Sequence, residues 1–193
     1  METLISLFRL HADIESRVQA IRMDHPQWLC GKGCAGCCRR LADVPQLTAA
    51  EWNSLREGLA ALPAERLREI SRNMAALADP RKRPVVCPLL DQSANACPVY
   101  VQRPVACRSY GFYVQRDKGL YCADIEAQVA DGFLDDVVWG NHDAIDQGLA
   151  LLGGIRSLTE WFEHWITAKL IIEPRQPVAA NDLQTDRQWS PGT

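Results

Sequence analysis

Cysteine is the residue type in this chain whose number and spacing point to chemistry. Eight cysteines occur among 193 residues, and all of them lie between positions 30 and 122. They are Cys30, Cys34, Cys37, Cys38, Cys87, Cys97, Cys107 and Cys122. Thiols that merely fill a core would be scattered along the whole chain. Thiolates are soft ligands that select zinc, copper(I) or iron–sulfur clusters over hard cations, so all eight cysteines are candidate metal ligands.

Four of these thiols lie within nine residues, in segment 28–40, which also contains three glycines. Glycine permits a positive φ and lets backbone amides approach sulfur closely, as a chelating loop requires. Cys37 and Cys38 are neighbours, and two neighbouring thiolates are hard to place on one mononuclear centre. We therefore expect them to bind different metals, or one to bind while the other packs beside the site. The gaps between the four later cysteines leave their pairing open.

The expected compartment decides whether grouped cysteines bind metal or form disulfides. The first residues lack a basic segment, and Arg9 and Asp13 interrupt their apolar run too early for a signal peptide. The longest uncharged apolar stretch elsewhere, 147–155, is far shorter than the ~20 residues that span a bilayer. We therefore expect a cytoplasmic protein without a membrane segment, in which reduced thiols bind metal.

Basic residues are interleaved with the cysteines. Segment 30–40 holds three basic residues and no acid, and segment 81–118 holds seven basic and two acidic residues, although the whole chain carries a net charge of −3. Thiolates around zinc or a cluster leave a negative charge whose burial needs nearby donors. Arg103 and Arg108 flank Cys107, so we expect them to donate to a thiolate or to a carbonyl of the cysteine loop. The alternative is that Arg108 faces water.

The elements that must position these cysteines are mostly helical. Capping-box spacing at Thr48–Glu51 and Ser157–Glu160 marks two helix starts, and prolines at 84, 88, 98 and 104 forbid a long helix between 85 and 123. Apolar periodicity predicts helices over 3–24, 49–62, 63–78 and 157–172, with helical character returning after 124 and short strands at 85–86 and 112–114.

These signals predict a mainly α fold, in which helices pack around an irregular cysteine-rich metal-binding centre with at most short strands. We expect a single metal-binding domain over residues 1–172, with its cysteine-cluster region at 28–122. Residues 173–193 hold three prolines and few apolar residues, which indicates a loosely docked tail.

Four blocks of the sequence, taken in order, carry a family resemblance. They are Cys30-x3-Cys34-x2-Cys37-Cys38-Arg39, Leu47-Thr48-x2-Glu51, Cys87-Pro88-Leu89-Leu90-Asp91 and Cys97-Pro98-Val99-Tyr100-x2-Arg103-Pro104-x2-Cys107-Arg108-x-Tyr110. Together they resemble the CxxCxxCC cysteine-cluster family, described as zinc- or iron-chelating, over roughly 28–122. The first gap here holds three residues where the nickname has two. The resemblance implies eight metal-linked cysteines, and some relatives are flagellin lysine methylases. We expect Arg39, Arg103, Arg108 and Tyr110 to lie around the ligands.

Other interpretations of the cysteines match less well. The spacing Cys30-x3-Cys34-x2-Cys37 is also that of radical S-adenosylmethionine enzymes, but Gly36 stands where those enzymes usually have an aromatic residue. Two Cys-Pro pairs resemble haem-responsive dipeptides, which are weak evidence. A nucleic-acid-binding zinc finger would need a basic recognition helix, and no predicted helix is basic.

The sequence therefore favours a metal-binding protein, with an iron–sulfur cluster preferred over zinc because one Cys-x2-Cys knuckle among eight thiols suits a cluster better than two zinc fingers. The rival functions are an enzyme that uses that centre in methylation-type chemistry on a protein or small-molecule substrate, and a metal storage or trafficking module. No catalytic residue is assigned. Among the histidines, His142 is the candidate auxiliary ligand. Segment 124–146 holds seven carboxylates and no Lys or Arg, which indicates a solvated face or a docking surface for a basic partner.

Overall fold

The computed structural model describes residues 6–77, 83–115, 119–120 and 122–172. The predicted tail at 173–193 and most of the linker before Pro84 lie outside the described residues. The described elements, in chain order, are α1 (Leu7–Asp24), α2 (Gly36–Arg39), β1 (Gln46–Thr48), α3 (Ala49–Ala60), α4 (Ala64–Ala76), η1 (Tyr100–Gln102), α5 (Val105–Ser109), β2 (Tyr113–Gln115), β3 (Gly119–Leu120), α6 (Ala123–Ala130), β4 (Gly140–Asn141), α7 (His142–Leu149), β5 (Ile155–Ser157) and α8 (Leu158–Ile172). The mainly α prediction is confirmed.

Side-chain caps define the helix starts. The Thr48 side chain accepts from the Glu51 amide at the start of α3, and Glu51 accepts in return from the Thr48 amide, which is the predicted capping box. Ser157 and Glu160 form the same pair of hydrogen bonds before α8. The helix predicted over 3–24 is described from Leu7, where the Ser6 hydroxyl accepts from the Arg9 amide.

Two differences from the predicted elements concern the cysteine-bearing segments. The loop expected over 28–40 contains a single helical turn, α2, which carries two of the cysteines. The strand expected at 112–114 is β2, and it lies in a three-stranded sheet between β3, antiparallel, and β4, parallel. At the other predicted strand, Val85 pairs with Leu41 in an isolated bridge. The second sheet pairs β1 with β5, which joins the starts of α3 and α8.

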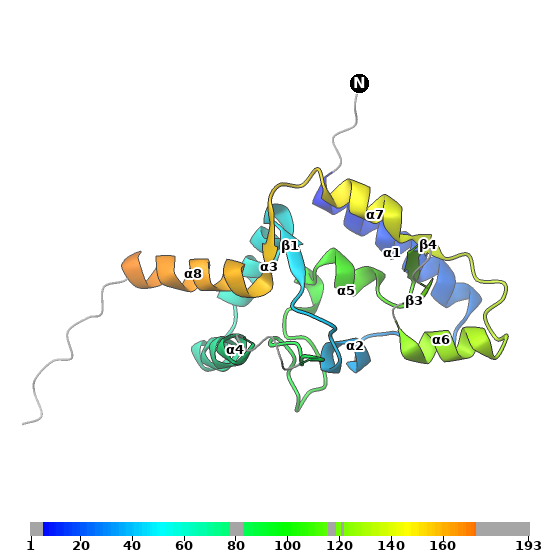
Figure 1. The fold of residues 1–193 in the computed structure, drawn as a ribbon, viewed down its shortest axis with the longest axis horizontal. Helices are drawn as coiled ribbons and strands as arrows, with labels where there is room; N and C mark the ends of the chain where they lie inside the picture. Colours follow the sequence, from blue (N-terminus) through cyan, green and yellow to red (C-terminus); the bar gives the residue numbers. More distant parts are fainter. Residues whose placement is uncertain (1–5, 78–82, 116–118, 121, 173–193) are drawn as a thin grey trace, which may run out of the picture.

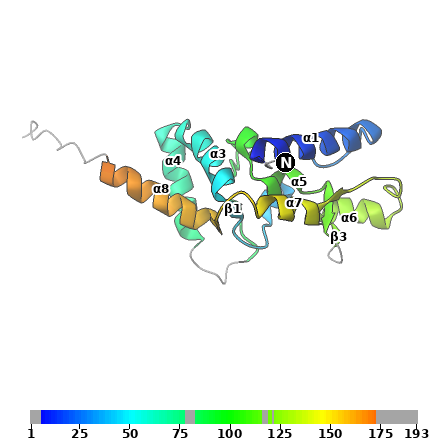
Figure 2. The same cartoon turned by 90° about the horizontal axis from the view of Figure 1, so that it is seen from above.

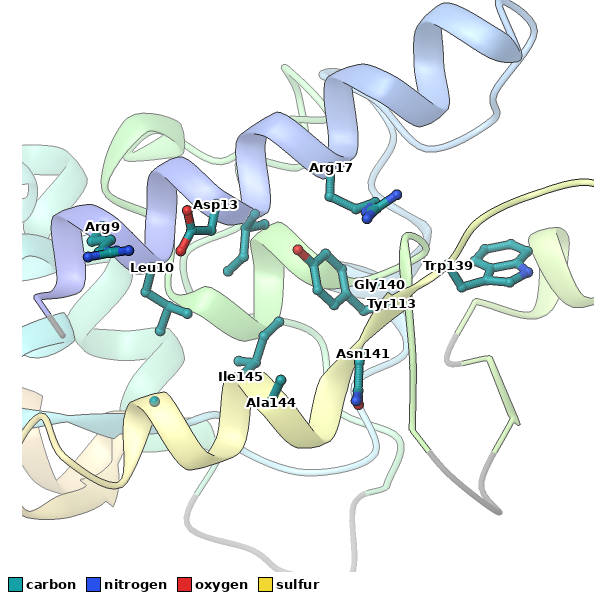
Figure 3. A pocket seen from close by; sticks show the side chains of 12 residues that line it. Arg9, Leu10, Asp13, Arg17, Tyr113, Trp139, Gly140, Asn141, Ala144 and Ile145 are labelled. Carbon is teal, nitrogen blue, oxygen red and sulfur yellow. The ribbon is translucent and has the colours of Figure 1, made fainter. Parts of the chain in front are cut away.

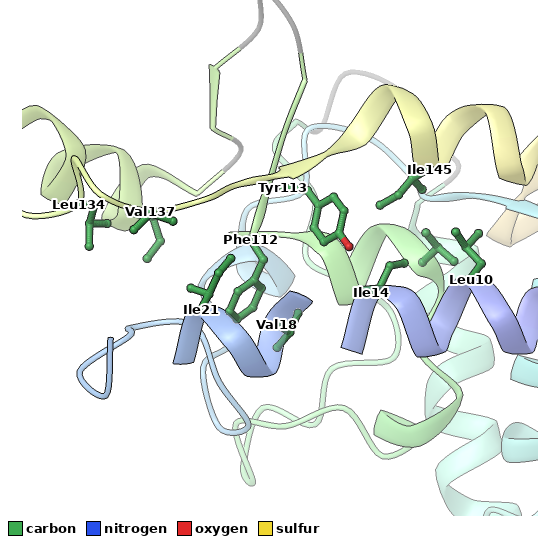
Figure 4. Close-up of a cluster of buried hydrophobic side chains, with 11 residues drawn as sticks. Leu10, Ile14, Val18, Ile21, Phe112, Tyr113, Leu134, Val137 and Ile145 are labelled. Carbon is green, nitrogen blue, oxygen red and sulfur yellow. The ribbon is translucent and has the colours of Figure 1, made fainter. Parts of the chain in front are cut away.

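Two clusters of buried apolar side chains lie at opposite ends of the molecule (Figures 1 and 2). The α1 cluster combines the buried face of α1 with residues of α5, α6, α7 and β2, and Figure 4 shows its side chains converging. The α3 cluster combines α3, α4 and α8 with the irregular segment around Leu89 and Val99. The expectation of one domain over 1–172 stays a prediction.

Candidate metal centre

Seven of the eight cysteines, all except Cys122, line one shared pocket. Among the eight we distinguish two neighbouring sets, because some of the cysteines pack against the α1 cluster and others against the α3 cluster. The first set is Cys30, Cys34, Cys37 and Cys122, which together line a pocket of about 230 Å³. Cys30 and Cys122 pack against the α1 cluster. The two residues come from distant parts of the chain, and the tight turn at Gly111 allows them to approach. Gly111 has φ +79°, and a Cβ there would lie 3.4 Å from the Cys30 Sγ, so this position needs glycine.

The second set is Cys38, Cys87, Cys97 and Cys107. The thiols of Cys38 and Cys87 form a hydrogen bond, and Cys97 and Cys107 lie close enough to Cys38 to interact with it electrostatically. The Cys87 amide donates to the Cys38 carbonyl at 2.7 Å, so the backbone also holds these two segments together. Cys87 and Cys97 pack against the α3 cluster. This set therefore belongs to the other end of the molecule.

The short helix α2 divides its two cysteines between the sets. Consecutive residues of a helix point about 100° apart around its axis, so Cys37 and Cys38 face different neighbours, although their Sγ atoms are only 4.0 Å apart. The expectation that the adjacent thiols bind different metals stays a prediction. Within the described residues, no three Cys, His, Asp or Glu side chains are close enough to hold one ion together.

Burial and neighbouring thiols raise the pKa of several of these cysteines, Cys30 and Cys107 among them. Burial, followed by the nearby Cys34, Cys37 and Cys122, raises the pKa of Cys30 to about 12. Burial and the charges of Cys38, Cys37 and Cys97 raise the pKa of Cys107 to about 12. A bound metal cation reverses this balance, because it binds the thiolate and displaces the proton.

Two arginines lie beside the two sets, and the sequence did not single out the first of them, Arg22. Arg22, on the last turn of α1, donates to the Cys30 carbonyl at 3.0 Å, and its charge opposes the rise in the Cys30 pKa. Arg103 donates to the carbonyls of Tyr100 and Cys107 and stacks 3.5 Å from the Tyr100 ring centre, and its charge acts on Cys97 and Cys107 in the same way. Neither guanidinium donates to a sulfur, so each acts through the backbone and through charge.

The remaining predicted neighbours of the ligands hold the loops in place. Arg108 donates to the carbonyls of Val101 and Arg103, which lie in its own segment rather than in the cysteine loop 28–40. Arg39 donates to the side chain of Asn95 at 2.8 Å. Tyr110 lines the pocket of the first set, and its carbonyl lies 3.4 Å from the Cys30 Sγ.

The cysteine-bearing region matches a known protein family. A family model described as "CxxCxxCC: Putative zinc- or iron-chelating domain" matches residues 29–127, which is just over half of the chain. The chain belongs to the CxxCxxCC family. No curated protein and no solved structure matches it. Each cysteine of the two sets lies inside the matched CxxCxxCC region, together with the arginines at 39, 103 and 108.

Two acidic residues of the CxxCxxCC motif blocks have structural roles near the second set. Glu51 is 3% exposed, and besides capping α3 its Oε1 accepts from the Val105 amide, the first residue of α5, at 2.9 Å. This bond sets the start of the helix that carries Cys107. Asp91 accepts from the amides of Ser93 and Ala94 and so closes the turn between Cys87 and Cys97. The capping-box spacing predicted the role of Glu51 at the start of α3. Its bond to the Val105 amide of α5 could not be predicted in the same way, because the two residues are 54 positions apart.

Asn95, in the CxxCxxCC region, also has a structural role that no sequence pattern predicted. It has φ +52°, donates to the Gly33 carbonyl at 2.9 Å and accepts from Arg39, so it joins the turn after Asp91 to the cysteine loop. His142, the candidate auxiliary ligand, lies at the start of α7 with its Nδ1 3.3 Å from the Asp146 carboxylate, and it lines neither cysteine pocket.

The acidic segment 124–146 forms a solvated face. Six of its seven carboxylates are exposed, and Asp143 is half-buried. A basic partner for this face stays a prediction.

None of the helices in the described ranges is long and apolar enough to cross a membrane.

Proposed function

We propose that this domain binds metal through two four-cysteine centres, each an iron–sulfur cluster, one held by Cys30, Cys34, Cys37 and Cys122 and the other by Cys38, Cys87, Cys97 and Cys107. The division of the adjacent cysteines of α2 between two sets carries this proposal. Four thiolates are the standard ligand set of both [4Fe–4S] clusters and structural zinc, so the donor chemistry suits either group.

The spacing of the cysteines supports the cluster over zinc, because one Cys-x2-Cys knuckle among eight thiols suits a cluster better than two zinc fingers. The first set also borders a pocket of about 230 Å³, and a cluster spreads its cysteines around a larger inorganic core than one zinc ion does. When bound, such a cluster supplies one-electron chemistry or a rigid structural cross-link.

The exposure of Cys34 supports a second candidate function. It is the exposed cysteine of the eight, whereas the others are half-buried. A centre with one solvent-accessible ligand can exchange its metal, which suits a storage or trafficking module. No observation in the described residues favours the methylation-type enzyme among the rival functions.

Metal analysis of anaerobically purified protein tests the proposal. Two [4Fe–4S] clusters give about eight iron atoms and eight sulfides per chain, a brown colour and charge-transfer absorption. Cys122→Ser and Cys107→Ser should each remove about half of the iron, because each removes a ligand of a different centre, while Ala60→Ser on the exposed face of α3 should keep it all. Colourless protein with about two zinc ions per chain would show that the metal is zinc and the division correct.

Two outcomes would overturn the division itself. If either cysteine variant loses all of its metal while remaining folded by circular dichroism, the eight cysteines form one shared centre. If neither variant loses metal, these two cysteines are not ligands.

A further inference from the structure

A pocket of about 650 Å³ lies between α1 and α7, over β2 and β4, and no cysteine lines it (Figure 3). Its floor is apolar and buried, and is made by Leu10, Ile14 and Ile145. Its rim is polar and carries Arg9, Asp13 and Arg17, spaced one turn apart along α1. An apolar floor with a few converging polar groups is the usual composition of a small-molecule site.

The pocket exists because the facing surface of α7 and β4 lacks bulky side chains. Gly140, Ala144 and Gly148 line it at intervals of four residues, so little side-chain volume from this strand–helix segment enters the space beside α1. The absence of a side chain at Gly140 has a further consequence. A Cβ there would lie 2.3 Å from the Tyr113 ring, so the ring rests directly on the β4 backbone and its position is fixed.

Three polar groups line the pocket and could pair with one another, but do not. They are the Asp13 carboxylate, the Arg17 guanidinium and the Tyr113 hydroxyl. In Figure 3 the Tyr113 hydroxyl and the Asp13 carboxylate both point into the pocket. The charges of Asp13 and Arg17 both act on the Tyr113 hydroxyl. Asp13 and Arg17 have the spacing and order that favour an ion pair on a helix. Among the described residues, neither Asp13 nor the Tyr113 hydroxyl has a hydrogen-bond or ion-pair partner, and Arg17 donates to the Val138 carbonyl at 3.4 Å.

We propose that this pocket binds a small zwitterion with an apolar body, of the α-amino acid class. The carboxylate of the ligand accepts from the Arg17 guanidinium and the Tyr113 hydroxyl, its ammonium donates to Asp13, and its apolar side chain lies on Ile14 and Ile145. This arrangement gives Asp13, Arg17 and the Tyr113 hydroxyl one partner each on the ligand. A simple anion would face the Asp13 carboxylate, and a simple cation would face Arg17. The proposal does not depend on the metal centre.

Three probes of the same shape separate these possibilities. L-Phenylalanine carries both charges, 3-phenylpropionate only the negative charge and 2-phenylethylamine only the positive charge. Binding to the metal-loaded full-length chain is measured by calorimetry and by the fluorescence of Trp139, which lines the pocket. We expect L-phenylalanine to bind at least about tenfold more tightly than either analogue, the equivalent of one charge-assisted hydrogen bond.

Substitutions with matched controls connect binding to this pocket. Asp13→Asn should weaken L-phenylalanine binding about tenfold and abolish its advantage over 3-phenylpropionate, and Arg17→Gln should abolish its advantage over 2-phenylethylamine. Glu57→Gln on α3 and Arg72→Gln on α4 make the same changes at exposed positions outside the pocket and should leave binding unchanged. Equal affinities for the three probes, no measurable binding of L-phenylalanine, or binding that is unaffected in Asp13→Asn would each overturn the proposal. Preferential binding of 3-phenylpropionate would identify an anion site instead.

Discussion

The two cysteine sets differ in how firmly the fold holds them. The first set lies against the α1 cluster and includes the exposed Cys34, with an open pocket beside it. The second set lies against the α3 cluster. There Glu51 bonds to the start of α5, the helix that carries Cys107, and Asp91 closes the turn between Cys87 and Cys97. If the two sets hold metal as proposed, we expect the first centre to exchange its metal more readily than the second.

Removing one ligand from each set should have the largest effect. Metal-binding energy is folding energy when the site has no other reason to order, so Cys107→Ser should lower the free energy of unfolding by more than about 3 kcal/mol. Cys34→Ser should cost less, because this thiol is exposed. Thermal melting and metal content, measured on the same samples, test both. A variant with full metal loading shows that its residue is not a ligand, and equal losses in both would remove the contrast between the two ends.

Glu51→Ala should be the next most damaging change, and its effect should be confined to the second set. It leaves the Thr48 and Val105 amides without their buried acceptor, which costs about 3 kcal/mol in total. The start of α5 then loosens, and with it Cys107. Urea denaturation and metal analysis should show a loss of stability and about half of the metal. Glu57→Ala, on the exposed face of the same helix, is the control, and an equal loss of metal from it would exclude the proposed role of Glu51.

Loss of a surrounding arginine should speed metal release without removing the centre. Arg22→Gln should affect the first set and Arg103→Gln the second, each by about 1–3 kcal/mol for one lost donor beside a buried anion. Release to a chelator is the measurement. Arg156 is exposed and stacks 5.0 Å from the Trp161 ring centre, remote from both sets, so Arg156→Gln is the control. Arg108→Gln should change release less than Arg103→Gln, because Arg108 bonds only to carbonyls of its own segment. Equal release from all four variants would mean that these arginines are surface charge.

The smallest expected effect is a pH dependence of stability at the α1 end. Burial, and then the charge of Arg108, lowers the pKa of His11 from 6.5 to about 4. Between these values the unfolded chain binds a proton that the folded chain does not, so stability falls as the pH drops from about 6.5 toward 4. The loss should not exceed about 2 kcal/mol, because the ring is only half-buried. The difference in urea midpoint between pH 7 and pH 5 should be smaller in His11→Gln than in the unchanged protein, and an identical difference would contradict the assignment.

Much of the helical framework could be predicted, because its signals are local. The caps at Thr48 and Ser157 satisfy backbone donors within three residues, and the buried stripe of α1 is visible as spacings of three and four. The turn α2 was missed because four residues carry no periodicity. The roles of Arg22 and Asn95 were missed as well, since their partners are backbone carbonyls brought close only by the fold.

The sequence by itself determined that this chain is mainly helical and that eight thiols would dominate its chemistry. Residue type decides which metals a ligand prefers, and hydrogen bonds between near neighbours decide where helices begin. Neither inference therefore needs knowledge of the tertiary structure. Only the tertiary structure decided which thiols lie near one another and so which of them we propose to share a centre. Cys30 and Cys122 are 92 positions apart in the printed sequence, and they meet because the turn at Gly111 and the packing of α6 against the α1 cluster bring them together. The pocket over Tyr113 also depends on the tertiary structure. Gly140 is required there because the Tyr113 ring, from another part of the chain, lies directly against it.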